Sequence, residues 1–311
     1  MTHRMKNFIF LLTFFSVIGA SLWVLMQSDP SDTAEAEAHS NTLSKPVNLE
    51  LGIVDPDNKF AGRKDIKTDA LFVPWASKNY EKTVVRLNAL SSDRKLMITV
   101  EPWPEKTGDE LFLKASSGYY DASITQLCTE FKSLSKTTTI RFAHEMEAPN
   151  SVYPWANVSP DEYIALYRHF VDVCKKSFST ASFMWSPNGE KSAPKFYPGK
   201  EYVDVIGLSA YGYPEFEQVI YGHNLSFVEM FQRKYNSVAD FPEPIYLAEF
   251  GVSSTVEYQT EYLQDAFLQM QNQFLFPKLI GVNYFYYYNP SPWIPGITPP
   301  DYRFDIKLIR L

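Results

Sequence analysis

Short apolar runs, rich in β-branched and aromatic residues, alternate along most of this chain with segments of helical periodicity. Eight runs predict strands, at residues 49–54, 70–75, 95–103, 138–145, 181–188, 203–211, 244–251 and 279–288. Helices are predicted between some of them, at 121–134, 161–176, 225–235 and 257–274. Apolar strands that alternate with helices form a parallel sheet covered on both faces. We therefore expect a (β/α)8 TIM barrel. An open doubly wound sheet is the alternative, but no glycine-rich phosphate turn follows the first strand.

Charge and composition exclude several classes of function. The 311 residues contain 36 acidic and 29 basic side chains, a formal net charge of -7. Without a broad basic surface, we expect no nucleic-acid partner. Two cysteines and five histidines show no metal-ligand spacing, so we expect neither a metal nor another cofactor.

The N-terminus predicts a membrane anchor. Arg4 and Lys6 precede an uncharged apolar stretch that ends at Gln27, about the length that spans a bilayer. We expect residues 1–27 to anchor the chain, 28–46 to form a flexible linker, and 47–311 to form the barrel. The basic residues before the span place the barrel outside the cytoplasm, at the periplasm or cell surface. Cleavage of the N-terminal segment would instead give a secreted protein.

Two glutamates end predicted strands. Counted at period two, Arg141, Ala143 and Glu145 share one face of the fourth strand. Glu249 ends the seventh strand in the same way. The carboxyl ends of barrel strands form the catalytic face. A glutamate pair about 5–5.5 Å apart is the machinery of a retaining glycoside hydrolase; the alternative is two solvated loop carboxylates.

Aromatic side chains gather at the same strand ends. Sugar rings have apolar faces that stack on Trp and Tyr. The candidates for such contacts are Trp103, Trp155, Trp185, Tyr211 and Tyr284, all at or just beyond strand ends. Trp75 fits a core role as well as a sugar contact.

Several motifs resemble those of glycoside hydrolase family 26 in order and spacing. They are Arg141-Phe-Ala-His-Glu145-Met146, Tyr153-Pro-Trp155, Trp185-Ser-Pro-Asn188, Tyr197-Pro-Gly, and Pro244-Ile-Tyr-Leu-Ala-Glu249-Phe-Gly251. The family contains β-mannanases and related endo-β-glycanases on a (β/α)8 barrel. The resemblance covers residues 138–251 closely and the flanks more loosely.

The resemblance implies a role for each matched residue. Glu145 would be the general acid/base and Glu249 the nucleophile. His144 matches a sugar-contacting histidine, and Tyr211 matches a tyrosine that hydrogen-bonds the nucleophile. Trp155 and Trp185 match aromatic residues that line the cleft.

Departures from the family pattern leave the substrate open. Glu147-Ala148 stands where mannanases have Asn-Gly, and the eighth strand ends in Tyr284-Phe-Tyr-Tyr-Tyr288 where a tryptophan is usual. Glu147 is either a charge that raises the pKa of Glu145 or a solvated loop residue. Cys128 and Cys174 could pair if their helices are neighbours, but two buried free thiols are the favoured interpretation.

These features predict a membrane-tethered endo-β-glycosidase that hydrolyses a β-linked polysaccharide of mannan or β-glucan type by the retaining mechanism. The location suits a partner in polysaccharide synthesis or export. A non-catalytic glycan-binding or assembly subunit is the alternative from another class, and it predicts a lost glutamate. A transglycosylase would use the same two glutamates.

Overall fold

The computed structural model describes residues 49–76, 93–104, 110–148, 153–156 and 158–304. They belong to a unit that spans Pro46–Leu311. The predicted anchor and linker lie outside the described residues. Within the described ranges, no helix is long and apolar enough to cross a bilayer.

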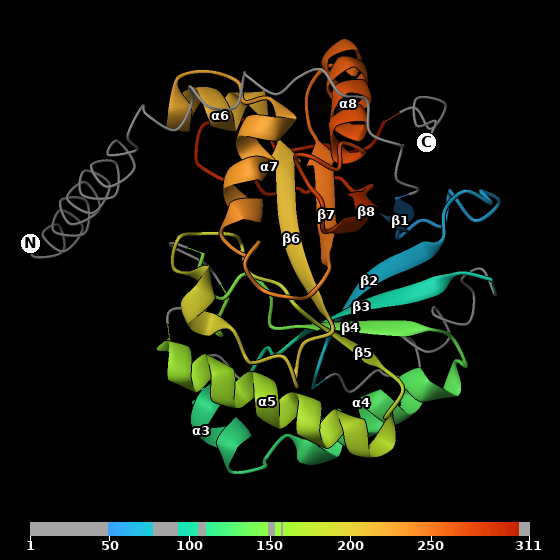
Figure 1. Cartoon of the computed structure of the whole chain (residues 1–311), viewed down its shortest axis with the longest axis vertical. Coiled ribbons are helices and arrows are strands. Elements are labelled where there is room, and N and C mark those ends of the chain that lie inside the picture. The colour runs from blue at the N-terminus through green and yellow to red at the C-terminus, as the bar shows by residue number, and fades with distance from the viewer. Residues whose placement is uncertain (1–48, 77–92, 105–109, 149–152, 157, 305–311) are drawn as a thin grey trace, which may run out of the picture. The chain divides into compact units, whose positions relative to one another are not determined.

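Eight parallel strands close into a barrel in sequence order (Figure 1), which confirms the predicted (β/α)8 architecture. The strands are β1 (Glu50–Val54), β2 (Thr68–Pro74), β3 (Lys95–Glu101), β4 (Thr138–Phe142), β5 (Ser182–Trp185), β6 (Val205–Gly212), β7 (Ile245–Val252) and β8 (Leu279–Phe285). All eight residues of β7 are buried. Both faces of a barrel strand are covered, which is why apolar residues occupy both faces of most of these segments rather than one.

Helices pack outside the strands. They are α3 (Leu111–Ser116), α4 (Asp121–Ser133), α5 (Pro160–Ser177), the 3-10 helix η3 (Ala193–Phe196), α6 (Pro214–Tyr221), α7 (Phe227–Asn236) and α8 (Val256–Met270). Figure 1 shows α3 and α4 beside α5, while α7 lies near α8. Phe170 of α5 stacks on Phe142 of β4 with ring centroids 3.9 Å apart, and so fixes this helix against the fourth strand.

Local capping sets several helix ends. Ser159 accepts a hydrogen bond from the backbone N–H of Glu162, whose side chain bonds back to Ser159, and Pro160 opens α5. The last predicted helix ends at Met270 rather than Phe274. There the Asn272 side chain accepts from the backbone N–H of Phe274 at 3.0 Å, a turn that competes with further helix.

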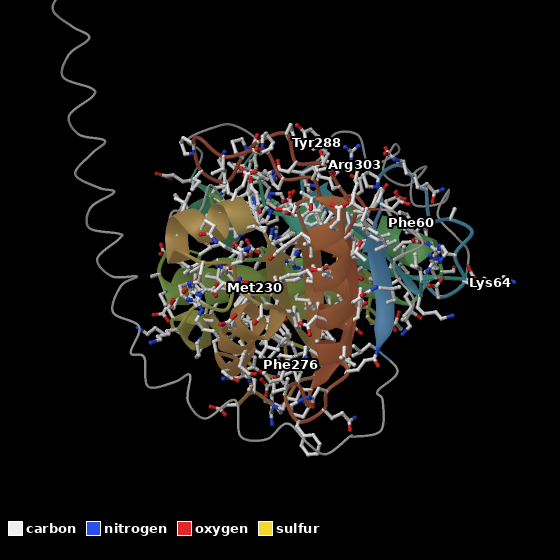
Figure 2. All side chains as sticks on the ribbon, turned by 90° about the horizontal axis from the view of Figure 1, so that it is seen from above. Phe60, Lys64, Met230, Phe276, Tyr288 and Arg303 are labelled. Carbon is white, nitrogen blue, oxygen red and sulfur yellow. A yellow bond between two sulfur atoms is a disulfide. The ribbon has the colours of Figure 1, made fainter. Side chains whose placement is uncertain are left out.

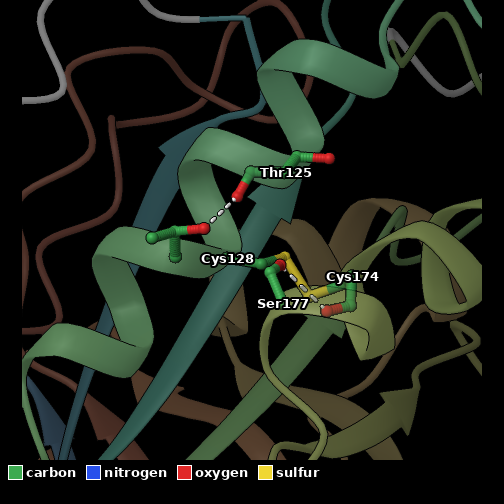
Figure 3. The surroundings of a disulfide bond; sticks show 5 residues. Thr125, Cys128, Cys174 and Ser177 are labelled. Carbon is green, nitrogen blue, oxygen red and sulfur yellow. Dashed lines mark hydrogen bonds between the residues drawn. A yellow bond between two sulfur atoms is a disulfide. The ribbon is translucent and has the colours of Figure 1, made fainter.

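A disulfide joins Cys128 of α4 to Cys174 of α5 (Figure 3), so the preference for two free thiols is wrong. The two Cα atoms lie 5.5 Å apart, and both side chains are fully buried. The pairing depends on which faces of the two helices meet. That relation is tertiary, and the sequence separation of 46 residues does not reveal it.

Candidate active site

Glu249 lies within β7 with its carboxylate bound by two other strands. Arg141 of β4 donates from Nη1 to Oε1, and the Tyr211 hydroxyl of β6 donates to Oε2. The tyrosine bond expected from the family resemblance is therefore present. The two donors occupy both carboxylate oxygens and fix the orientation of the side chain. Glu249 is only 7% exposed, so water competes little for these bonds.

Arg141 is a functional residue that the sequence analysis did not single out. Its fully buried guanidinium also donates from Nε to Ser186 Oγ at 2.8 Å and from Nη2 to Ser209 Oγ at 3.3 Å. Ser209 is the register partner of Glu249, next to an irregularity between β6 and β7. An arginine within an otherwise uncharged strand was the available signal, because a buried charge requires a partner.

Glu145 lies beyond β4 rather than on it. The strand ends at Phe142, so the prediction of a strand to residue 145 is wrong. Ala143 (φ 48°) and Glu145 (φ 55°) both adopt the left-handed region that non-glycine residues rarely occupy. The turn is held because the Ala143 carbonyl accepts from the Tyr163 hydroxyl at 3.1 Å and Glu145 N–H donates to the Ser186 carbonyl at 2.8 Å. Backbone strain of this kind clusters at functional sites.

The surroundings of Glu145 favour its protonated form. Burial raises the pKa of Glu145, and the negative charge of Glu249 raises it further, while Arg141 and Lys234 act in the opposite direction. A carboxyl whose pKa is raised thus lies near a second carboxylate that Arg141 and Tyr211 bind. Such a division of roles is what acid-assisted glycosidic cleavage requires.

His144 forms part of the wall beside Glu145. Its Nε2 lies 3.2 Å from the Tyr153 hydroxyl, and its carbonyl accepts from Trp155 Nε1 at 2.7 Å. Burial, followed by the charge of Arg141, lowers the pKa of His144 well below its usual range, so the ring is neutral. Its buried Nδ1 has no hydrogen-bond partner. A neutral imidazole can both donate and accept a hydrogen bond, and the sugar contact expected of His144 stays a prediction.

The predicted cleft aromatics fall into two groups. Trp103 is 37% exposed, and its Nε1 donates to Glu101 Oε2 at 3.2 Å. Trp155, Trp185 and Tyr284 are fully buried. Trp155 stacks on Tyr153 with centroids 4.6 Å apart. This placement fits support of Tyr153 and His144 from behind better than the predicted sugar stacking, because a fully buried ring presents no face to a ligand.

Trp185 and Tyr284 likewise contact protein on all sides. Trp185 packs against Tyr197 and Phe241, and the Tyr284 hydroxyl donates to the Tyr302 carbonyl at 2.8 Å. Trp75 is also fully buried, which agrees with its core alternative.

Glu147 is not a solvated loop charge. Its Oε1 accepts from the backbone N–H groups of Gly189 (2.8 Å) and Glu190 (3.2 Å), and burial raises its pKa. Lys234 of α7 reaches the same loop and donates to Asn188 Oδ1 at 2.7 Å. A Cβ on Gly189, whose φ is +92°, would lie 2.6 Å from the Lys234 Cβ, so this close approach requires glycine. Glu147 and Lys234 therefore hold the loop after β5 close to Glu145.

Glu101 adds a further carboxyl at the end of β3. Burial raises its pKa, and the charge of Glu249 acts in the same direction. Among the residues that the structure describes, no group of three or more His, Cys, Asp or Glu side chains could hold a metal ion.

A closed barrel with one glutamate after its fourth strand and another on its seventh is the framework of a glycoside hydrolase. The model of "Glycosyl hydrolase family 26" matches residues 118–258. Over residues 118–258, the chain is therefore similar to glycoside hydrolase family 26.

A similar protein is Endoglucanase H of Acetivibrio thermocellus, which is 28% identical over 217 residues. The match covers 66% of this chain and 23% of that protein, so the chain spans about a quarter of its relative's length. Among solved structures, GH26C from Muricauda sp. has a TM-score of 0.59 at 18% identity, covering 80% of this chain and 83% of its own. The catalytic domain of the endo-beta-1,4-mannanase from Bacillus sp. JAMB-750 has a TM-score of 0.56 at 13% identity, covering 82% and 75%. These two likenesses show the fold.

Proposed function

We propose that this protein is an endo-β-glycosidase that hydrolyses a β-linked polysaccharide of mannan or β-glucan type with retention of configuration. The observation that carries the proposal is the pairing of Glu249, bound by Arg141 and Tyr211, with Glu145, whose pKa burial raises. One glutamate follows β4 and the other lies on β7, and the barrel brings them close enough for the charge of Glu249 to raise the pKa of Glu145. The names of an endoglucanase relative and of mannanase structures support the substrate class.

The reaction has two steps, and each glutamate has its own role in both. Glu249 attacks the anomeric carbon and forms a glycosyl ester, while Glu145 gives its proton to the departing glycosidic oxygen. Glu145, now ionised, takes a proton from water, and the hydroxide oxygen displaces Glu249 from the anomeric carbon. Two inversions give net retention. The carboxylate of Glu249 loses its negative charge as the ester forms, so its hydrogen bonds from Arg141 and Tyr211 weaken. They strengthen again when the ester breaks and the charge returns.

The test is incubation of the soluble barrel with β-mannan, mixed-linkage β-glucan, cellulose and β-xylan. We expect new reducing ends on β-mannan or a β-glucan, with internal cleavage visible as an early fall in polymer length. Proton NMR before mutarotation should show the β-anomer first. An α-anomer would contradict the mechanism, and products longer than an oligosaccharide substrate would identify a transglycosylase. No cleavage, with binding retained, would favour the glycan-binding subunit.

We also propose that residues 1–27 tether the barrel outside the cytoplasm, where it would meet polysaccharide during synthesis or export. The support is the uncharged apolar stretch that follows Arg4 and Lys6. Full-length protein should fractionate with membranes until detergent is added. Recovery in the cytosol would disprove the tether, whereas recovery as a shortened secreted form would show cleavage.

The pH profile should depend on Lys234. The general acid must be protonated, so kcat/KM falls as the pH rises above its pKa. The positive charge of Lys234 lowers the pKa of Glu145. Lys234→Met, which keeps the aliphatic stem against Gly189, should therefore raise this pKa and move the basic limb of the profile to higher pH.

The matched control is Lys176→Met, since Lys176 is an exposed lysine of α5. It should leave the profile unchanged. A shift of equal size in both variants would assign the effect to net charge rather than to Lys234.

A further inference from the structure

Trp293 is an exposed tryptophan that no sequence motif marked. The structure describes five tryptophans, of which Trp103 (37%) and Trp293 (39%) are exposed, while the other three are fully buried. Trp293 lies in the loop after β8, and its ring contacts Tyr211, Tyr213 and Phe216 at centroid distances of 5.5, 5.3 and 5.0 Å. Tyr211 lies on β6, Tyr213 is the N-cap of α6 and Phe216 lies on α6, so the indole joins the loop after β8 to the connection between β6 and α6.

The loop that carries Trp293 is fixed at several points. Its two ends pair at the Tyr288–Asp301 bridge, and the Arg303 guanidinium lies 5.4 Å from the Tyr288 ring centroid (Figure 2). Thr298 N–H donates to Glu215 Oε2 at 2.7 Å, and the Thr298 carbonyl accepts from the Tyr213 hydroxyl. A side chain held in this way loses little conformational entropy when a ligand binds.

Trp293 is separated from Glu249 by one side chain. It packs on Tyr211, whose hydroxyl donates to the carboxylate of Glu249. If that carboxylate attacks the anomeric carbon, a sugar bound over Tyr211 would be the attacked sugar or its neighbour on the glycone side. An exposed indole at this point presents the flat apolar surface that a sugar ring stacks on.

The other exposed tryptophan lies on the side of the acid/base. Trp103 follows β3 and contacts Tyr153, the hydrogen-bond partner of His144. In a closed barrel of eight strands, β4 and β8 are four strands apart and therefore opposite each other. The loop of Trp293 and the residues around Glu145 thus flank the mouth from opposite sides.

We propose that Trp293 is the platform of a glycone-side sugar subsite, adjacent to the ring that Glu249 attacks, and that it sets how strongly the enzyme favours longer glycones. The inference rests on the proposed function. It adds a binding residue on the loop that follows the eighth strand.

The test compares 4-nitrophenyl β-glycosides of one, two and three sugars, in both the gluco and manno series. For the unmutated enzyme, kcat/KM should rise with glycone length. Trp293→Ala should lose about tenfold or more on the two- and three-sugar substrates, because an aromatic contact of this kind amounts to about one order of magnitude in binding. The one-sugar substrate should be affected much less. Trp293→Phe should restore part of the loss, and Phe274→Ala, at a 64% exposed aromatic that precedes β8, should change nothing.

A binding experiment distinguishes failure of this inference from failure of the proposed function. Calorimetry with cellohexaose and mannohexaose should show weaker binding to Glu249→Gln/Trp293→Ala than to Glu249→Gln alone. If no substrate is cleaved but Trp293→Ala still weakens binding, the enzyme proposal fails and the subsite stands. Equal loss on all three glycone lengths, or unchanged binding and kinetics, would overturn the subsite.

Discussion

Glu249→Ala should abolish turnover of every substrate, with a loss of at least about 10⁴-fold in kcat, because no glycosyl ester can form. Added azide should fill the space left by the carboxylate and attack in one step. The product from an activated β-aryl glycoside would then be the α-glycosyl azide, identified by NMR.

Stability needs a separate control for this variant. Removal of Glu249 leaves the buried guanidinium of Arg141 without its carboxylate, which destabilises by about 3–5 kcal/mol in comparable cases. Glu249→Gln keeps an oxygen that can accept from Arg141 and Tyr211, so it should retain more of the thermal stability. Both variants should be equally inactive without azide. Turnover by Glu249→Gln near that of the unmutated enzyme would assign the nucleophile elsewhere.

Glu145→Ala should behave differently, because an activated aryl leaving group needs no proton. Its first step should proceed, and the glycosyl ester on Glu249 should accumulate and be visible by mass spectrometry. Polymer cleavage should fall by about 10²–10⁴-fold, the usual contribution of general acid–base catalysis. Azide should then release the β-glycosyl azide and raise the turnover of the aryl glycoside.

The anomer of the azide product separates the two roles. A generic pair of cleft carboxylates would give the same product from both variants. An α-azide from Glu145→Ala would reverse the assignment. Equal loss on polymer and on the activated glycoside would show that Glu145 does not act by proton donation.

The motifs that resemble the family singled out Glu145 and Glu249 in the sequence. They did not predict the backbone conformation of Glu145. Period-two counting assumes that the strand continues to residue 145, whereas Ala143 and Glu145 take left-handed conformations after Phe142. Those conformations depend on the Tyr163 hydroxyl and the Ser186 carbonyl, which belong to other elements. No local pattern encodes them.

The aromatic residues also show that sequence position alone did not predict which side chains are exposed. Tryptophans at strand ends suggested a sugar-binding cleft, yet Trp155 and Trp185 are fully buried, and the exposed Trp293 lies five residues past the last predicted strand. Strand-end position indicates which end of the barrel a side chain approaches. Whether it faces ligand or core depends on the neighbouring loops.

What the sequence by itself determined is the (β/α)8 barrel, the similarity to glycoside hydrolase family 26 and the positions of Glu145 and Glu249 in the motifs that carry it, because apolar periodicity and short motifs are local properties of the chain. The tertiary structure decided which groups meet. It paired Arg141 with Glu249, joined Cys128 to Cys174, and set Trp293 on Tyr211. Each of these contacts joins residues at least 46 positions apart, and only closure of the barrel and the packing of its helices bring them together.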